Sequence, residues 1–358
     1  MIPVADDVRA AFLSSSAADV RAEVMHARRV LGRLDVAACS VTDDGDAFAR
    51  RSASLACAAT PEAVDMLSRP GVGVRVSVGI GFGGTVHWVP VHWGCVFTRG
   101  RSMTSAAIDI TSTDMFTRLK RARFLSPRAS TRGSTVPLQI FELARERIRW
   151  AGVVNESHVA PAVAPVTWDT DRDKAIEDLA SSAGLEAFWR PTGDIVVRPV
   201  RSITMRPDAH IRQGVSLADA SWTQSSETVI NAVRAHSDSS NGAGFSGVSI
   251  DADPTSPTFV DGEFDMNVAY YSSELFTSNA QCRQAALAQR LLQSRNVETV
   301  EVTCALMPWL ETGDRINVSV EGRLFQGVAT NISFDCFGAS MTITLALAKA
   351  PEGEGELE

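Results

Sequence analysis

Alternation of apolar and polar residues dominates this sequence and predicts a chain built largely of β-strands. Every second residue is apolar between Val72 and Ile80, as expected for a strand with one buried face. The same pattern predicts further strands at residues 20–24, 53–57, 85–98 and 105–111. Residues 4–13 instead have helical spacing and predict a short amphipathic helix. The first 110 residues are therefore expected to form a mainly antiparallel sheet after one helix.

The middle of the chain changes to mixed helix and strand. Thr135 is expected to cap one helix, and Asp169 or Thr170 a second helix that stops at Gly184. A hairpin is expected over residues 186–200, because two strand patterns there flank a Pro-Thr-Gly-Asp turn. This small unit is too short to bury much surface alone, so we expect it to pack on a neighbour.

Strand patterns return after about residue 201, with a polar loop at 237–257 and one helix at 278–293 between them. The expected strands lie at 297–306, 315–320, 323–334 and 339–348. The fold class is thus a β-rich α+β protein. The expected divisions are residues 1–135, 136–205 and 206–350, followed by an acidic tail at 351–358.

Composition is that of an ordinary folded protein of two or three domains, with 358 residues of which 45% are hydrophobic. The net charge of −8 argues against a general nucleic-acid-binding surface. It is unevenly spread, because residues 1–135 carry net +5 and the remainder net −13. No apolar stretch is long enough to span a bilayer, and early Asp6 and Asp7 are unlike a secretion signal, so synthesis in the cytoplasm is expected. The six scattered cysteines are expected to be free, buried thiols.

One basic segment interrupts the strand patterns, between residues 112 and 133. Its basic residues are Arg118, Lys120, Arg121, Arg123, Arg128 and Arg132. A short helix followed by an exposed loop is expected here. The segment could be a docking interface for an acidic partner, or it could be only a solvated face and linker. The second interpretation is favoured.

Two motifs near residue 80 have ordinary structural explanations. The sequence GIGFGG at residues 79–84 has the spacing of a dinucleotide-binding loop, but a strand pattern rather than a helix follows it, so we expect a hairpin turn. His87, His92 and Cys95 hint at zinc. However, residues 87 and 92 of an extended chain point to opposite faces, and we expect no metal there.

A second metal motif fails on its spacing. Asp169, Asp171 and Asp173 match the start of a calcium loop, but Lys174 replaces the glycine and Ala180 the final glutamate. We expect these acids to complement a helix N-terminus instead.

No arrangement of residues typical of catalysis is evident. The nearest approach to a nucleophile elbow, at residues 244–247, lies in the polar loop, as do Asp251 and Asp253. The seven tryptophans are dispersed and are expected to anchor cores or interfaces rather than form a sugar platform. We therefore expect no catalytic residue, cofactor or metal site, and no enzymatic activity.

The order of several segments resembles minor tail proteins of actinobacteriophages, of the baseplate or tail-tip hub family. In the N-terminal part the resemblance rests on residues 1–12, 20–44, 49–58, 86–97 and 119–124. In the rest of the chain it rests on residues 167–175, 183–200, 227–233, 253–257 and 310–318. Each segment alone is degenerate, but together they cover nearly the whole chain.

This resemblance implies two tail-tube-like β-barrel domains with a small α+β insertion domain, assembled as a homotrimer. Such a hub would be a structural virion protein at the tail tip that continues the tail tube. Its implied partners are the distal tail protein, the tape-measure protein and tip or spike proteins, with DNA passing through the lumen without specific binding. No membrane anchor or cofactor is implied. We expect no long C-terminal hydrolase or receptor-binding extension, so the resemblance says nothing of host choice.

Two other functions remain open from the sequence. A carbohydrate- or cell-surface-binding accessory tail protein would use the tryptophans, and a hydrolase would need a site that the motifs do not reveal. A binding module would retain its ligand as a monomer, whereas a hub would be recognised by its stoichiometry.

Overall fold

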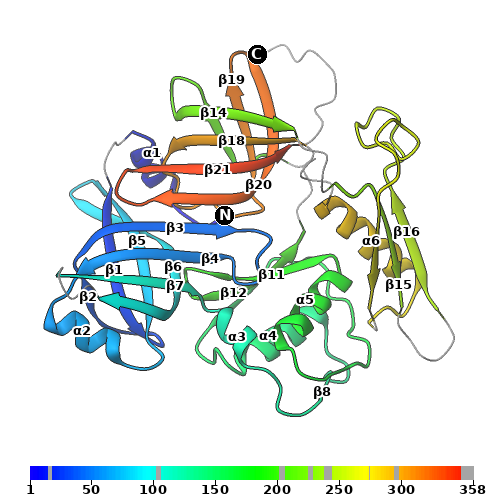
Figure 1. Cartoon of the computed structure of the whole chain (residues 1–358), viewed down its shortest axis with the longest axis horizontal. Helices are drawn as coiled ribbons and strands as arrows, with labels where there is room; N and C mark the ends of the chain where they lie inside the picture. The colour runs from blue at the N-terminus through cyan, green and yellow to red at the C-terminus, as the bar shows by residue number, and fades with distance from the viewer. Residues whose placement is uncertain are drawn as a thin grey trace.

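A computed structural model describes the chain except for residues 15–17, 102–105, 201–205, 225–228, 238–243, 274, 294–297 and 348–358. The expected acidic tail at 351–358 lies outside the described residues. Strands and three short helices alternate in the N-terminal part (Figure 1). They are α1 (Asp6–Ser14), β1 (Asp19–His26), β2 (Arg29–Leu34), β3 (Val36–Asp44), β4 (Arg51–Ala58), α2 (Pro61–Ser68), β5 (Gly73–Phe82), β6 (Thr85–Arg101), β7 (Ala107–Asp114) and α3 (Thr117–Arg121).

The middle part combines two helices with a three-stranded sheet. Its elements are β8 (Arg128–Ala129), α4 (Val136–Arg145), β9 (Gly152–Asn155), β10 (Thr167–Trp168), α5 (Arg172–Ser182), β11 (Leu185–Arg190) and β12 (Asp194–Pro199). The hairpin of β11 and β12 confirms the sequence prediction, and β9 adds a parallel strand that was not expected. Asp171 rather than Asp169 or Thr170 is the N-cap of α5, and its side chain makes no capping hydrogen bond.

The C-terminal part contributes six strands to the largest sheet. They are β13 (Ala209–Arg212), β14 (Leu217–Gln224), β18 (Glu298–Ala305), β19 (Arg315–Val320), β20 (Arg323–Asp335) and β21 (Ser340–Leu347). The last four agree closely with the strands expected from alternation.

A separate small unit is inserted between β14 and β18. It consists of β15 (Ala232–His236), β16 (Ser246–Ile250), β17 (Val268–Ser272) and α6 (Asn279–Gln293). The expected polar loop at 237–257 therefore contains a strand, β16, which pairs with β15. Short strands of Ser, Gly and one or two apolar residues carry little periodicity, which explains why the pattern missed it.

One continuous sheet joins the N- and C-terminal parts. Its main path runs β14-β18-β21-β20-β3-β4-β7-β6-β5-β1-β2, and β19 and β13 branch from β20. The connection between the halves is the antiparallel pairing of β20 with β3. Figure 1 shows β14, β18, β21, β20, β3 and β4 one below another. The β-rich α+β class is confirmed, but no pairing among the described strands closes either half into the expected barrel.

A shared hydrophobic core explains why the halves form one body. Val41, Ile332 and Ile343, from β3, β20 and β21, belong to the same buried cluster as Val74 and Val76 of β5. A second core lies between the middle part and the β6–β7 region, and a third lies under α6. All six cysteines are free and buried, as expected.

Candidate functional site

The most extensive functional candidate is a polar face of the continuous sheet. Side chains alternate across a strand, so one face of β18, β21, β20, β3, β4 and β7 packs on the core and the other does not. On the outer face, cross-strand partners form rows that run through both halves of the molecule. The first row consists of Thr303, Thr342, Ser333, Thr42, Ser52 and Thr113. The second consists of Ala305, Ser340, Asp335, Ser40, Ser54 and Thr111.

These side chains are short, and each is exposed or half-buried. The charged residues on this face of the six strands are all acidic, namely Asp44, Asp109, Glu301 and Asp335. No Lys or Arg of these described strands points to the same side. A shallow groove of about 340 Å³ crosses it between β3 and β4, lined by Ala38, Ser54 and Asp109 among others. We refer to this surface as the polar sheet face.

A buried ion pair lies directly under the joint between the halves. Arg51 of β4 binds Asp43 of β3 at 2.8 Å, and both side chains are almost fully buried. Arg51 also donates to the carbonyl oxygens of Val91 and Leu310, at 2.7 and 3.4 Å. Thr312 donates its hydroxyl to Asp43 at 3.1 Å. The pair therefore ties the N-terminal strands to the loop before β19.

Further buried charges attach the middle part to the same loop. Arg190 of β11 donates two hydrogen bonds of 2.8 Å to Glu311, and Arg198 of β12 donates to the Thr312 carbonyl at 2.6 Å. Arg198 also binds Glu186. Burial alone would raise the pKa of Glu186, but the charges of Arg198 and Arg50 outweigh it and lower the pKa to about 2. The three parts of the chain are thus held in a fixed relation by paired charges.

Two buried groups near Arg51 have strongly shifted acidities. Burial raises the pKa of Asp114 to about 7, although its carboxylate accepts the backbone N–H groups of Arg51 and Phe116. Burial and the charge of Arg51 lower the pKa of His92 to about 3. The His92 ring lies 2.8 Å from the Ser112 hydroxyl. Both His92 and Asp114 are buried inside the protein, and burial is the main cause of both pKa shifts.

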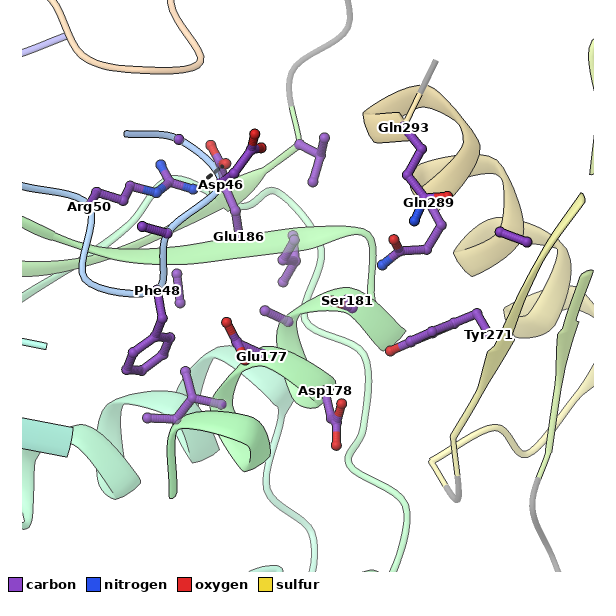
Figure 2. A pocket seen from close by; sticks show the side chains of 18 of the residues that line it. Asp46, Phe48, Arg50, Glu177, Asp178, Ser181, Glu186, Tyr271, Gln289 and Gln293 are labelled. Atoms are coloured by element: carbon purple, nitrogen blue, oxygen red, sulfur yellow. Dashed lines mark hydrogen bonds and ion pairs between the residues drawn. The ribbon is translucent and has the colours of Figure 1, made fainter. Parts of the chain in front are cut away.

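A cleft of about 770 Å³ separates the middle part from the α6 unit (Figure 2). Gln289 and Gln293 of α6 face Ser181 of α5 across it, and Glu177 lies on the same side as Ser181. Burial, together with two neighbouring acids, raises the pKa of Glu177. The described lining contains no His, Cys or Lys, and it offers no nucleophile with an adjacent base.

The predicted basic segment does not form one continuous patch. Arg118 donates to the Gly71 carbonyl at 2.9 Å and to the Cys95 sulfur at 3.2 Å. Arg123 pairs with Asp171 at 3.0 Å, and Arg128 pairs with Glu146 at 2.9 Å. Lys120, Arg121 and Arg132 are exposed, as are Arg123 and Arg128 despite their ion pairs, and Arg121 lies over the Phe97 ring. Three of the six basic side chains therefore already have a partner within the chain.

The other sequence motifs have local roles. The GIGFGG segment forms the turn of the β5–β6 hairpin, as expected, with Gly83 and Gly84 at positive φ. His87 is half-buried and His92 is buried. The expected opposite orientation is wrong, because a bulge in β6 shifts the register, so that His87 and His92 are paired with Ile80 and Val76 on the same face of β5. Among the described residues, no three His, Cys, Asp or Glu side chains lie together as metal ligands would. No helix within the described ranges is long and apolar enough to cross a membrane.

Most tryptophans face inward. Trp93, Trp150 and Trp189 form a cluster with ring centroids 4.9 to 5.9 Å apart, and Trp309 is buried beside Phe12. Trp222 of β14 is exposed over 54% of its surface, and Trp88 is half-buried under the Arg21 guanidinium. The tryptophans therefore do not form an exposed platform.

No protein-family model and no curated protein matches the sequence. Three solved structures of tail proteins match this chain and are covered over nearly their whole length. The tail protein from Neisseria meningitidis MC58 aligns with a TM-score of 0.66 at 15% identity, covering 92% of this chain and 97% of that one. The chain has the fold of a phage-type tail protein.

Two prophage proteins show the same likeness. The 43 kDa tail protein of prophage MuSo2 from Shewanella oneidensis gives a TM-score of 0.63 at 13% identity, over 91% of this chain and 98% of that one. The prophage tail protein gp18 from Listeria monocytogenes EGD-e gives 0.55 at 13% identity, over 94% and 95%. The fold shared with these tail proteins includes both halves of the continuous sheet, because the aligned regions leave out little of either chain.

The polar sheet face was missed by sequence reasoning. A signal for it was present in the sequence. In segments such as residues 51–58 and 340–347, the positions that face outward are Ser, Thr or Ala, and the one charged residue, Arg51, is buried. Alternation alone could not align these strands, because register between distant strands depends on the tertiary fold.

Proposed function

We propose that this chain is a structural hub of a phage tail tip or baseplate, in which three copies form a ring that continues the tail tube. The polar sheet face lines the central channel of that ring. The observation that carries this proposal is the rows of Ser and Thr that cross from one half of the sheet to the other with only acidic charges beside them. Each half of the sheet then acts as one tube-like unit, so three copies supply six.

Such a surface suits the passage of DNA. Protein surfaces hold DNA mainly through Lys and Arg on its phosphates, and each neutralised phosphate adds salt-dependent affinity. A channel wall of short hydroxyl and carboxylate side chains offers no such contact. DNA therefore passes without specific binding.

Two unpaired strand edges at the ends of the polar sheet face supply the contact between copies. Among the strands that the structure describes, β14 pairs with β18 alone, and beyond Val96 the described part of β6 pairs with β7 alone. Unpaired edges are ready templates for another chain. Trp222 on β14 and Phe97 on β6 are both exposed at these edges. We assign the ring contact to β14 of one copy and the end of β6 of the next.

The proposed divisions at 1–135, 136–205 and 206–350 then have separate tasks. The first and last supply the ring, and the middle part braces them through Arg190 and Arg198. The neighbours are a distal tail protein on one side and tip or spike proteins on the other, with the tape-measure protein ending near the lumen. The role is structural rather than enzymatic. The inward-facing tryptophans give the carbohydrate-binding alternative no support.

Cryo-electron microscopy of the assembled particle tests this function. We expect three copies around the tail axis, with Ser54 and Thr342 facing the channel. Copies at the periphery, or a channel lined by the opposite surface, would overturn the proposal.

A further inference from the structure

The small unit formed by β15, β16, β17 and α6 has a sheet face on which most apolar side chains are exposed, although Ala232 on the central strand is buried. Residues paired across the three strands form three rows on this face. One, His236 with Ser246 and Ser272, is polar, and the other two are apolar apart from Arg234. Val248, Arg234 and Tyr270 form one row, and Ile250, Ala232 and Val268 form the other. The exposed fractions are 56% for Val248, 71% for Tyr270, 42% for Ile250 and 39% for Val268.

The opposite face of the same sheet has an ordinary core. Val233 and Ala235 of β15 point to that side and pack with Cys282 and Ala285 of α6. Helix α6 also contacts α5, so it lies between the sheet and the body of the molecule (Figure 1). The apolar rows consequently face away from the body. The exposed apolar residues cannot be explained as the core side of this sheet.

The face is also held in a fixed shape. Asn231, fully buried, donates to the carbonyl oxygens of Thr258 and Asp265 at 2.9 and 2.8 Å and accepts the N–H of Asn267 at 2.8 Å. These bonds attach the long β16–β17 connection to the start of β15. Met266, in the same connection, is also exposed, to 51%. A preformed surface loses less conformational entropy when a partner binds.

Contiguous apolar patches of this kind on soluble proteins mark interaction sites. Arg234 defines what the partner must carry. It is exposed at the middle of the apolar rows, and no ion pair or hydrogen bond joins its side chain to another described residue. Burying this guanidinium in an apolar contact is costly unless a carboxylate pairs with it.

The same residue argues against a second copy of this chain as the occupant. A contact between two identical faces would bring Arg234 toward Arg234 around a twofold axis, where like charges repel. A different protein, apolar around one Asp or Glu, meets both requirements of the face.

We propose that the outward face of the β15–β17 sheet docks a second tail protein through an apolar surface centred on one carboxylate. The inference rests on the proposed function for the source of this partner. It goes further by assigning the partner to a surface far from the polar sheet face in the fold.

Particles that carry variants of this chain test the docking surface. The changes are Arg234→Glu and, separately, Val248→Ser with Tyr270→Ser. All three positions are exposed, so the fold should tolerate them within about 0.5 kcal/mol. We expect three copies of this chain to remain at the tail tip, while one other protein falls by about tenfold or more in quantitative mass spectrometry of purified particles.

Matched controls are Val215→Ser, an apolar residue exposed to 73% elsewhere, and Arg69→Glu at the C-cap of α2. These should leave the composition unchanged. A photo-cross-linking residue at Tyr270 should identify the lost protein, and an Asp or Glu→Arg change in it should restore binding to the Arg234→Glu chain.

Two results would overturn the inference. Full composition in both face variants would show that the face docks no other tail protein, and cross-links to a second copy of this chain would assign the face to self-contact. Absence of the wild-type chain from the tail tip would instead refute the proposed function, so the two failures are distinguishable.

Discussion

Ser333 of β20 is paired in register with Thr42 of β3, and this pair is where the two halves of the chain become one sheet. On the other side of the same strands lie Ile332 and Val41, both buried. The joint is thus polar outside and apolar inside, like the strands on either side of it. Two domains in loose contact would not continue one alternation of buried and exposed side chains across the boundary between them.

Adding positive charge to the polar sheet face should make it bind DNA. Ser54→Lys with Thr111→Lys places two ammonium groups on adjacent strands. Each phosphate contact adds about 0.9 to the salt slope of binding, so the purified double variant should bind duplex DNA with a slope near −2. Fluorescence anisotropy at several salt concentrations measures this.

The matched control is Ser14→Lys with Ser68→Lys, which adds the same charge at exposed helical positions. In particles, the face variant should lower infectivity by about tenfold because DNA is retained, while the control should not. Equal effects from both pairs would show that net charge, and not the position of the charge, is responsible.

Breaking the ion pair below the joint should unfold the protein at lower denaturant. Arg51→Ala leaves Asp43 charged and buried, and we expect a loss of about 3–5 kcal/mol in the free energy of unfolding. Arg69→Ala removes an exposed pair with Asp65 and should cost less than about 1 kcal/mol. Urea titrations of the two variants beside the wild type give both values. Similar losses would mean that the Arg51 pair is not effectively desolvated.

Much of the fold could be predicted because alternation and helix spacing act locally. The run from Val72 to Ile80 and the segment 340–347 became strands as expected, and Thr135 is the N-cap of α4. Helix α2 was missed, although Thr60 caps it and Pro61 begins it, because it has only eight residues between two strong strand patterns.

The arrangement of these elements could not be predicted in the same way. The pairing of β20 with β3 brings together residues almost 300 positions apart, and no local pattern specifies such a partner. The basic segment illustrates a further limit. Its composition predicts a cluster of exposed basic residues. In the structure, however, Arg118 binds the Gly71 carbonyl and Arg123 pairs with Asp171, and both partners are about 50 residues away in the sequence.

Two buried groups should give the stability opposite dependences on pH. Asp114 has a pKa of about 7 in the folded state, above its unfolded value of about 3.9. Between these values the native state binds a proton that the unfolded state has lost, so the contribution of Asp114 to stability falls as the pH rises from 4 to 7. His92 has a folded pKa of about 3, below its unfolded 6.5, so its contribution rises from pH 3 to 6.5.

Because the two windows overlap, variants are needed to separate them. The wild-type stability minus that of Asp114→Asn should fall as the pH rises through 4–7. The corresponding difference for His92→Gln should rise over 3–6.5. Urea unfolding at each pH gives both differences, and flat profiles would show that neither shift survives in solution.

A charged residue at the unpaired edge of β14 should prevent the ring from closing. Trp222→Lys puts an ammonium group where the next copy is proposed to dock, a device by which natural edge strands avoid pairing. Sedimentation of the purified chain should show fewer trimers, or a trimer that dissociates at about tenfold higher concentration. Val215→Lys, in the turn before β14, should leave the association unchanged. If both variants behave like the wild type, the copies meet elsewhere.

Charge reversal in the basic segment should separate docking from folding. Lys120→Glu with Arg121→Glu changes two exposed side chains, so stability should move by less than about 1 kcal/mol while docking to an acidic neighbour in the tail weakens. Arg118→Glu differs, because it loses the hydrogen bonds to Gly71 and Cys95 and should also destabilise the fold. Urea unfolding and the yield of complete particles measure the two effects separately. Unchanged assembly with Lys120→Glu and Arg121→Glu would leave the segment as a solvated face, in which Arg118, Arg123 and Arg128 have partners within the chain.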